Sequence, residues 1–386
     1  MYRIGQEEIN AAKTVIETKD FFKVNGSLQS CYKLEEALKN RFSVNHASFV
    51  TSGFGALVSA LIGFGIGPGD EVIVPAYTYI ATAMAVVNVG AIPVIAEIDE
   101  TLGLDPDDFE KKISKYTKAV IPVHMQGMPC NMDRICEIAA KHGIKVLEDA
   151  CQANGASFGG RLLGSIGDAG ALSFNFFKII SCGEGGALLT KDSSIYEKAC
   201  IYQDSSAIAY FGDQMNGFSQ LPFCGNEYRG NEILAAIMCC QLEKLDSIVA
   251  DLRRNKAKLL SLLGDVCVAP SNDADGDCGI QIPFRFDTYE KAKDFSEKTG
   301  QMLLYNCGKH VYYDWAPIME KRGAAHELMN PYNMPANKDL NHNYSPDMCP
   351  KSLDLLKRTV TYGISPDWTD EEIEATAEKI NSILNS

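Results

Sequence analysis

One lysine lies in surroundings that would suit a nucleophile. Lys178 follows two phenylalanines and precedes a glycine-rich turn within "SFNFFKIISCGEGG" (173–186). An apolar setting lowers the pKa of a lysine, and the neutral amine then attacks carbonyl groups. The alternative is an ordinary lysine whose ammonium group reaches solvent. The neighbouring motifs help to decide between the two.

A carboxylate ends another apolar run. In "VLEDACQANGA" (146–156), Glu148 and Asp149 come at the end of a predicted strand. A buried aspartate needs a cationic partner. That partner is either an arginine in a structural salt bridge or the protonated ring nitrogen of a bound cofactor.

A third motif could hold a phosphate. In "VTSGFGALVSALIGFGIG" (50–67), Thr51, Ser52 and Gly53 come directly before a predicted helix. A helix N-terminus offers unpaired N–H groups and a partial positive charge, which suit an anion. The alternative is an ordinary N-cap serine. The glycines at 63–69 follow a helix and lead into a strand, which is the wrong order for a dinucleotide-binding fingerprint.

Together these motifs indicate one kind of site. A phosphate-binding helix start, a strand-end aspartate and a partly desolvated lysine after Ser173 are the three parts that pyridoxal phosphate requires. An aromatic ring from "YTYIAT" (77–82) could lie over the cofactor as a fourth part.

The elements that position these residues alternate between strand and helix. Short runs rich in Val, Ile and Leu predict strands over 71–77, 92–99, 118–125, 144–150, 169–175 and 186–190. Because these runs show little polar alternation, they predict an α/β domain with a mainly parallel sheet covered on both faces. Ligands bind beyond the carboxyl ends of the strands in such sheets.

The composition changes after a long helical pattern over 231–263, in which we expect a break near Asp246. A half-exposed strand, a helix and a loop rich in Asn, Pro and His follow. Thr369 and Glu372 predict a capping box at the last helix. We therefore expect an N-terminal helical arm (1–30), a large cofactor-binding α/β domain (31–249) and a small α+β domain (250–386).

Composition excludes several classes of function. The formal net charge of −14 argues against nucleic acid as a partner. No apolar stretch is long enough to span a membrane, and the N-terminus does not resemble a secretory signal. The 13 cysteines form no C-x-x-C pair, which favours buried thiols in a reducing cytoplasm and no metal site.

The ordered motifs resemble the DegT/DnrJ/EryC1/StrS aminotransferases, sugar aminotransferases of fold type I. The resemblance covers nearly the whole chain and is densest over 45–245. The blocks that carry it are "TSGFGAL", "GPGDEVIVPAYTYIATA", "VIPVHMQGMPCNMD", "VLEDACQANGA", "GSIGDAGALSF", "KIISCGEGGALLT" and "NEYRGNEILAAI".

The resemblance implies roles for individual residues. Lys178 would form the Schiff base with the cofactor, and Asp149 would bind the pyridinium nitrogen. Tyr79 would stack on the ring, and Gln152 would lie beside its 3-oxygen. The phosphate would contact Ser52, Gly53, Phe54, Gly55 and Ser173.

Two departures from the family pattern concern the phosphate. Phe54 stands where the family has a threonine, so only its backbone N–H remains for the phosphate. The family is typically a homodimer, and a neighbouring subunit lends an asparagine to the phosphate. Glu227 holds that place here and Asn226 lies one residue earlier, so we expect Asn226 to serve.

The resemblance also implies the reaction. Family members that act as 3-dehydratases replace the lysine with histidine, so Lys178 favours transamination from glutamate or glutamine to a keto-sugar, with pyridoxamine phosphate as the second cofactor form. The product would serve surface glycans such as lipopolysaccharide, or a secondary metabolite. The finer resemblance is to the branch acting on 8-oxo-Kdo and cyclitol ketones.

The alternatives are a dehydratase or epimerase, and a cofactor-binding regulator without turnover. We expect substrate contacts from the loop at His124 and from His310, Tyr312 and Trp315, for which ordinary packing is the alternative.

Overall fold

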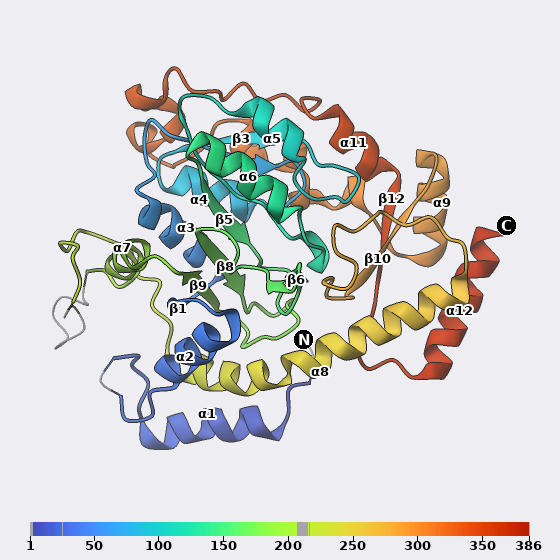
Figure 1. Cartoon of the computed structure of the whole chain (residues 1–386), viewed down its shortest axis with the longest axis horizontal. Coiled ribbons are helices and arrows are strands. Elements are labelled where there is room, and N and C mark those ends of the chain that lie inside the picture. Colours follow the sequence, from blue (N-terminus) through green and yellow to red (C-terminus); the bar gives the residue numbers. More distant parts are fainter. Residues whose placement is uncertain (1–2, 25, 207–214, 216, 386) are drawn as a thin grey trace.

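The computed structural model describes residues 3–24, 26–206, 215 and 217–385. A seven-stranded sheet forms its centre, in the order β1-β9-β8-β5-β4-β2-β3 (Figure 1). Strand β9 pairs antiparallel with β1 and β8, and the other neighbours pair in parallel, so the expected mainly parallel sheet is confirmed. The strands are β1 (His46–Val50), β2 (Glu71–Pro75), β3 (Ile92–Ala96), β4 (Thr117–Val120), β5 (Lys145–Asp149), β8 (Ala169–Ser173) and β9 (Gly186–Thr190).

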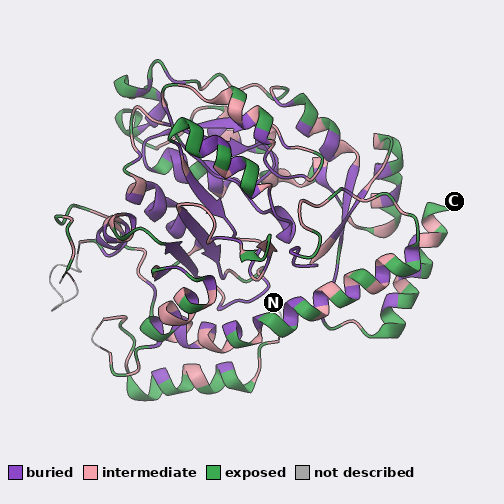
Figure 2. Ribbon diagram, in the orientation of Figure 1, coloured by how far each residue is buried: buried purple, intermediate pink, exposed green. Residues whose placement is uncertain are grey.

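Helices cover both faces of this sheet. Successive strand side chains point to opposite faces, so Ile73 packs in one apolar cluster while Val72 and Val74 pack in the other. The strands are accordingly buried along most of their length (Figure 2). The helices of this part are α1 (Gln6–Thr18), α2 (Ser30–Phe42), α3 (Gly53–Phe64), α4 (Ala81–Asn88), α5 (Pro106–Lys112), α6 (Met132–His142) and α7 (Ser193–Gln203), and β6 (Ser157–Phe158) and β7 (Arg161–Leu162) form a short hairpin.

Helix α8 (Glu232–Leu263) is continuous, so the break expected near Asp246 is wrong. The stretch 243–250 contains neither glycine nor proline, and an aspartate on an exposed face does not end a helix. The first half of α8 packs against α1 and α2, and the helix runs on to α12 (Figure 1). The predicted domain boundary at 249/250 therefore lies inside one helix, and the division into domains stays a prediction.

The C-terminal part builds a second, three-stranded sheet in the order β10-β12-β11, antiparallel throughout. The capping box of Thr369 and Glu372 at the start of the last helix is confirmed. The sequence also predicts a strand over 301–307; the structure forms one only at Met302–Leu303, and a turn of 3-10 helix follows at Leu304–Asn306. The elements are β10 (Gln281–Arg285), α9 (Tyr289–Thr299), β11 (Met302–Leu303), α10 (Ala316–Met319), α11 (Pro350–Lys357), β12 (Thr359–Gly363) and α12 (Asp370–Leu384).

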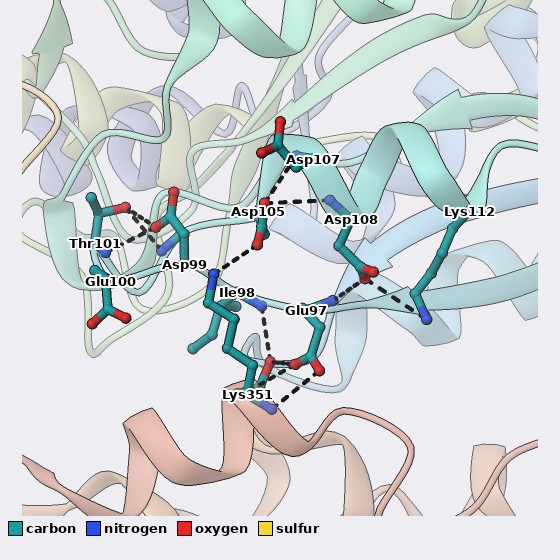
Figure 3. Close-up of polar contacts among 12 residues, drawn as sticks. Glu97, Ile98, Asp99, Glu100, Thr101, Asp105, Asp107, Asp108, Lys112 and Lys351 are labelled. Carbon is teal, nitrogen blue, oxygen red and sulfur yellow. Dashed lines mark hydrogen bonds and ion pairs between the residues drawn. The ribbon is translucent and has the colours of Figure 1, made fainter.

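A polar network fastens the C-terminal part to the sheet. The Glu97 carboxylate, after β3, accepts hydrogen bonds from the backbone N–H groups of Lys351 (3.2 Å) and Ser352 (2.7 Å) in the first turn of α11. The Lys351 ammonium group lies 2.8 Å from the Asp105 carboxylate (Figure 3). A carboxylate at a helix N-terminus stabilises the helix by accepting hydrogen bonds from N–H groups that have no partner within it.

None of the helices in the described part of the chain has the length and apolar character needed to cross a bilayer. Within that same part, His, Cys, Asp and Glu side chains form no group of three or more that could hold a metal ion.

Candidate active site

A cavity of about 610 Å³ opens beyond the carboxyl ends of β5 and β8. This is the edge at which open α/β sheets bind ligands. The second sheet contributes to the lining through Gln281, the first residue of β10, and through Ile280 just before it. The predicted residues that line the cavity are Ser52, Gly53, Phe54, Tyr79, Asp149, Gln152, Ser173, Lys178 and His310.

Lys178 is held on a tight turn between β8 and β9. Its backbone N–H donates to the Asn175 carbonyl at 2.9 Å, and the Phe176 N–H donates to Gly183 at 2.9 Å. Among the described residues, none forms a hydrogen bond or ion pair with the Lys178 ammonium group. An amine that lines a cavity without a partner is free to react with a bound ligand.

Asp149 lies at the end of β5 and is 5% exposed. One carboxylate oxygen, Oδ2, accepts from the Thr82 hydroxyl at 2.8 Å, and the other, Oδ1, accepts from the Cys151 N–H at 3.2 Å. Its neighbour Glu148 points the opposite way and accepts from three backbone N–H groups and from His124. Of the two adjacent carboxylates, only Asp149 therefore faces the cavity.

A cluster of neutral donors lies at the start of α3. The Ser52 hydroxyl oxygen caps the helix by accepting from the Gly55 N–H at 3.0 Å, so its own proton remains available to a ligand. The N–H groups of Gly53 and Phe54 precede the first intrahelical bond. A Cβ atom on Gly53 would lie 2.6 Å from Cys151 Sγ and 2.9 Å from Ser173 Cβ. Only glycine therefore lets the helix start approach Ser173 this closely.

The amide of Gln152 is oriented by a backbone in an uncommon conformation. Gln126, in the short 3-10 helix after β4, has φ 55° and ψ 29°. Its N–H donates to Gln152 Oε1 at 3.1 Å. Because the oxygen is occupied, the Gln152 NH₂ group is the part left to donate into the cavity.

Two rings lie together at the mouth of the cavity. Tyr79, 44% exposed, is tilted against His310 with ring centroids 5.2 Å apart. Burial lowers the pKa of His310, and the Lys178 charge lowers it further. Burial also raises the pKa of Cys151 well above its usual value, with the Asp149 charge adding to the shift, so this thiol stays protonated.

Three residues expected to contact substrate lie elsewhere. His124 is fully buried, its Nδ1 accepts from the Cys130 N–H and its Nε2 lies 3.1 Å from Glu148. The Tyr312 hydroxyl donates to the Pro346 carbonyl, and the Trp315 indole N–H donates to the Lys309 carbonyl. The expectation of substrate contact is corrected for these three, because their polar atoms are used inside the fold and they do not line the cavity.

Two predicted cofactor contacts also lie outside the lining of the cavity in a single chain. Gly55 is buried in α3, where its N–H is bound to Ser52. Asn226 donates from its side chain to the Tyr202 hydroxyl at 2.6 Å. The Glu227 carboxylate accepts from the backbone N–H and the guanidinium group of Arg229.

Several lining residues were not singled out from the sequence. Thr82 lies within the quoted "YTYIAT" motif, and Cys151 lies beside Asp149, but neither residue type indicated a ligand. The lining residues without a sequence prediction include Leu57, Thr78, Ala81, Thr82, Val123, Cys151, Asn175, Phe177, Ile179, Glu184, Ile280 and Gln281.

The sequence model of the DegT/DnrJ/EryC1/StrS aminotransferase family matches residues 3–381. Over 242 residues the chain is 39% identical to GDP-perosamine synthase of Caulobacter vibrioides, a match that covers 62% of this chain and 64% of that protein. It is 30% identical over 393 residues to the spore coat polysaccharide biosynthesis protein SpsC of Bacillus subtilis, covering 99% of this chain and 95% of that protein.

Among solved structures, 3-amino-5-hydroxybenzoic acid synthase superposes with a TM-score of 0.80 at 26% identity. The superposition covers 100% of this chain and 97% of the synthase. The similarity in sequence and in fold therefore extends over both sheets and all of the long helices.

Proposed function

The chain belongs to the DegT/DnrJ/EryC1/StrS aminotransferase family, and we propose that it transfers an amino group from glutamate or glutamine to a keto-sugar. The observation that carries the proposal is the shared cavity of Lys178 and Asp149, with the donors of the α3 start beside them. The sugar aminotransferases among the relatives support a role in amino-sugar biosynthesis. The acceptor would be a nucleotide-linked sugar, or an 8-oxo-Kdo-like or cyclitol ketone.

The cofactor of this family is pyridoxal phosphate, and the residues present fit it. The Ser52 and Ser173 hydroxyls and the N–H groups of Gly53 and Phe54 would hold the phosphate. Phe54 contributes no hydroxyl, so the backbone and the two serines do this work. Lys178 would join the aldehyde carbon, and the carboxylate of Asp149 would hold the proton of the ring nitrogen.

When bound, the cofactor supplies an electron sink for the carbanion formed at the donor's α-carbon. The protein's own residues do the rest. Lys178 would act as the general base that takes the proton from the donor's α-carbon. Asp149 would keep the ring nitrogen charged. The Tyr79 ring would limit tilting of the cofactor, and the Gln152 NH₂ group would be the donor toward its 3-oxygen.

We propose that the substrate contacts His310, Gln281 and Glu184, three polar residues that line the cavity. His310 is the one member of the predicted substrate set that remains proposed. If its Nδ1–H donates to the Cys307 carbonyl 3.3 Å away, its Nε2 is an acceptor for a sugar hydroxyl.

We also propose a homodimer in which Asn226 reaches the phosphate of the neighbouring subunit. Glu227 is bound by Arg229, whereas the only partner of the Asn226 side-chain amide among the described residues is the Tyr202 hydroxyl. Large apolar side chains are exposed on the single chain: Phe177 beside Lys178 (84%), and Ile9 (58%) and Ile16 (55%) on α1. Such exposure favours burial against a second copy.

Product analysis tests the reaction. The wild-type enzyme, loaded with cofactor, is incubated with candidate keto-sugars and with glutamate or glutamine. Transamination predicts stoichiometric release of the 2-oxo acid with formation of an amino-sugar. A dehydrated or epimerised sugar with no 2-oxo acid would contradict it.

Subunit mixing tests the shared site. Alone, Lys178→Ala is expected to be inactive and Asn226→Ala to be weakly active. A hybrid dimer carries one site with Lys178 from one chain and Asn226 from the other, so mixing after dissociation should restore activity. Two impaired variants that stay impaired after verified subunit exchange would contradict a site shared in this way.

A further inference from the structure

We propose that Thr82 is a positioning residue for Asp149, and that a chain of two hydroxyls, Thr78 to Thr82, fixes the carboxylate for its contact with the ring nitrogen. The inference rests on the proposed role of Asp149. It concerns a group that neither the sequence motifs nor the family resemblance assigned.

The contacts are short and enclosed. Thr82 Oγ1 lies 2.8 Å from Asp149 Oδ2 and 2.7 Å from Thr78 Oγ1. Both threonines are 1% exposed. Thr82 is in the first turn of α4, and its N–H donates to the Tyr79 carbonyl at 3.1 Å, so the side chain projects from a fixed backbone.

The direction of the hydrogen bonds follows from proton counting. An ionised carboxylate only accepts, so the single Thr82 proton is donated to Asp149. The Thr82 oxygen must then accept from Thr78, whose own alternative acceptor, the Tyr79 carbonyl, is a longer 3.4 Å away. Hydrogen bonds arranged in such a chain strengthen one another.

The consequence concerns orientation. Among the residues that the structure describes, each Asp149 oxygen receives one donor: Thr82 on Oδ2 and the Cys151 N–H on Oδ1. The two bonds prevent rotation of the carboxylate, so its remaining lone pairs stay on the side that lines the cavity.

A matched pair of variants tests the proposal. Thr82→Val removes the hydroxyl and keeps a β-branched side chain of similar shape, whereas Thr82→Ser keeps the hydroxyl. The first readout is the ¹⁵N resonance of cofactor labelled at the ring nitrogen, measured in the loaded enzyme without substrate. In T82V the resonance should move from the wild-type position toward that of the unprotonated ring, and in T82S it should remain near wild type.

The second readout is the half-reaction with the amino donor in a single turnover. The rate should fall about tenfold or more in T82V, the effect of losing one hydrogen bond to a charged group. The donor's apparent affinity and the cofactor content should change little. Thr78→Val, which removes only the outer hydroxyl, should slow the same step by a smaller factor, about threefold.

The proposal is overturned if T82V keeps the wild-type resonance and a rate within twofold, or if T82S is as impaired as T82V. Should T82V fail to fold, T78V decides, and an unchanged resonance and rate in that variant overturn the hydroxyl chain. The resonance requires no sugar, so its result is independent of transamination. A wild-type enzyme that released no 2-oxo acid would instead contradict the proposed function.

Discussion

The cavity around Lys178 and the network around Glu97 contain the same kinds of polar group, but the two regions differ in how many of these groups have hydrogen-bond or ion-pair partners within the protein. At the network, Glu97 accepts from two N–H groups at the start of α11, and Lys351 pairs with Asp105 (Figure 3). At the cavity, the Lys178 ammonium group has no protein partner among the described residues, and Ser52, Gly53 and Phe54 at the start of α3 line the cavity.

Two helix N-termini make the difference concrete. A carboxylate from the loop after β3 binds the start of α11, whereas the start of α3 has only its own serine cap within the part of the chain that the structure describes. Buried polar groups are normally paired, so a cluster left open is a place for a ligand. We therefore expect polar groups that are paired within the protein to govern stability, and unpaired polar groups that line the cavity to govern activity. Each of the following changes tests this expectation.

The largest expected effect is on activity alone. Lys178→Ala should abolish turnover and the near-visible absorbance of lysine-bound cofactor. The stability of the cofactor-free protein should change by no more than about 0.5 kcal/mol, because no ion pair is lost. Absorbance spectra and urea unfolding check the two parts.

Lys145→Ala is the matched control, since Lys145 pairs with Asp168 at 2.6 Å, away from the cavity. It should keep both absorbance and turnover. Retention of the absorbance in K178A would mean that another lysine anchors the cofactor.

Asp149→Asn should leave the cofactor bound but slow turnover by about 10² to 10³. An amide cannot hold the ring proton by charge, so the electron sink weakens, while the phosphate contacts of Ser52 and Ser173 remain. Steady-state kinetics and cofactor content measure the two consequences. Wild-type rates with full cofactor content would remove Asp149 from the reaction.

The fold was largely predictable because buried strands and amphipathic helices impose apolar patterns on the chain. The runs at 71–77, 144–150 and 169–175 each contain a strand of the sheet. Strand β12 was missed because it follows α11 directly, with no turn residues to mark its start. The continuity of α8 was missed because an aspartate in a helical pattern resembles a break.

The site was predictable where a residue type carries chemistry by itself. Lysine, aspartate and a serine before a glycine indicated their roles, and the structure brings Lys178, Asp149 and Ser52 to one cavity. His124 was misplaced because the sequence does not show which side of the chain faces the cavity just after a strand. Thr82 was missed because a threonine near a helix start is most often a local cap. Its partner Asp149 lies 67 residues away in the sequence, so no local motif indicates the contact.

In the network, Glu97→Gln should destabilise the fold by about 2 kcal/mol, since a charged acceptor of two N–H bonds is replaced by a neutral one. Per-site turnover of the folded fraction should be unchanged. Urea unfolding followed by circular dichroism measures the loss. Glu100→Gln is the control, because Glu100 is exposed where it pairs with Arg285, and it should cost less than about 1 kcal/mol.

The smallest effect is expected at Asp105, and its pH dependence identifies the cause. Burial raises the pKa of Asp105, but the Lys351 ammonium group and the N–H groups of Asp107 and Asp108 outweigh it and hold the pKa below its ordinary value. The stabilisation is therefore present above that ordinary value and is lost as the pH falls through the lower folded-state pKa.

Asp105→Asn keeps an oxygen that can cap α5 and removes the charge facing Lys351. Because Lys351 is partly exposed, the loss at pH 7 should be at most about 1 kcal/mol. It should shrink as the pH falls through the lowered folded-state pKa, because the wild-type carboxyl then loses its charge as well. Unfolding by urea over a series of acidic pH values measures this, with Asp105→Ala, which also removes the cap, costing about 1 kcal/mol more. A difference between D105N and wild type that grew on acidification would assign the stabilisation to something other than the ion pair.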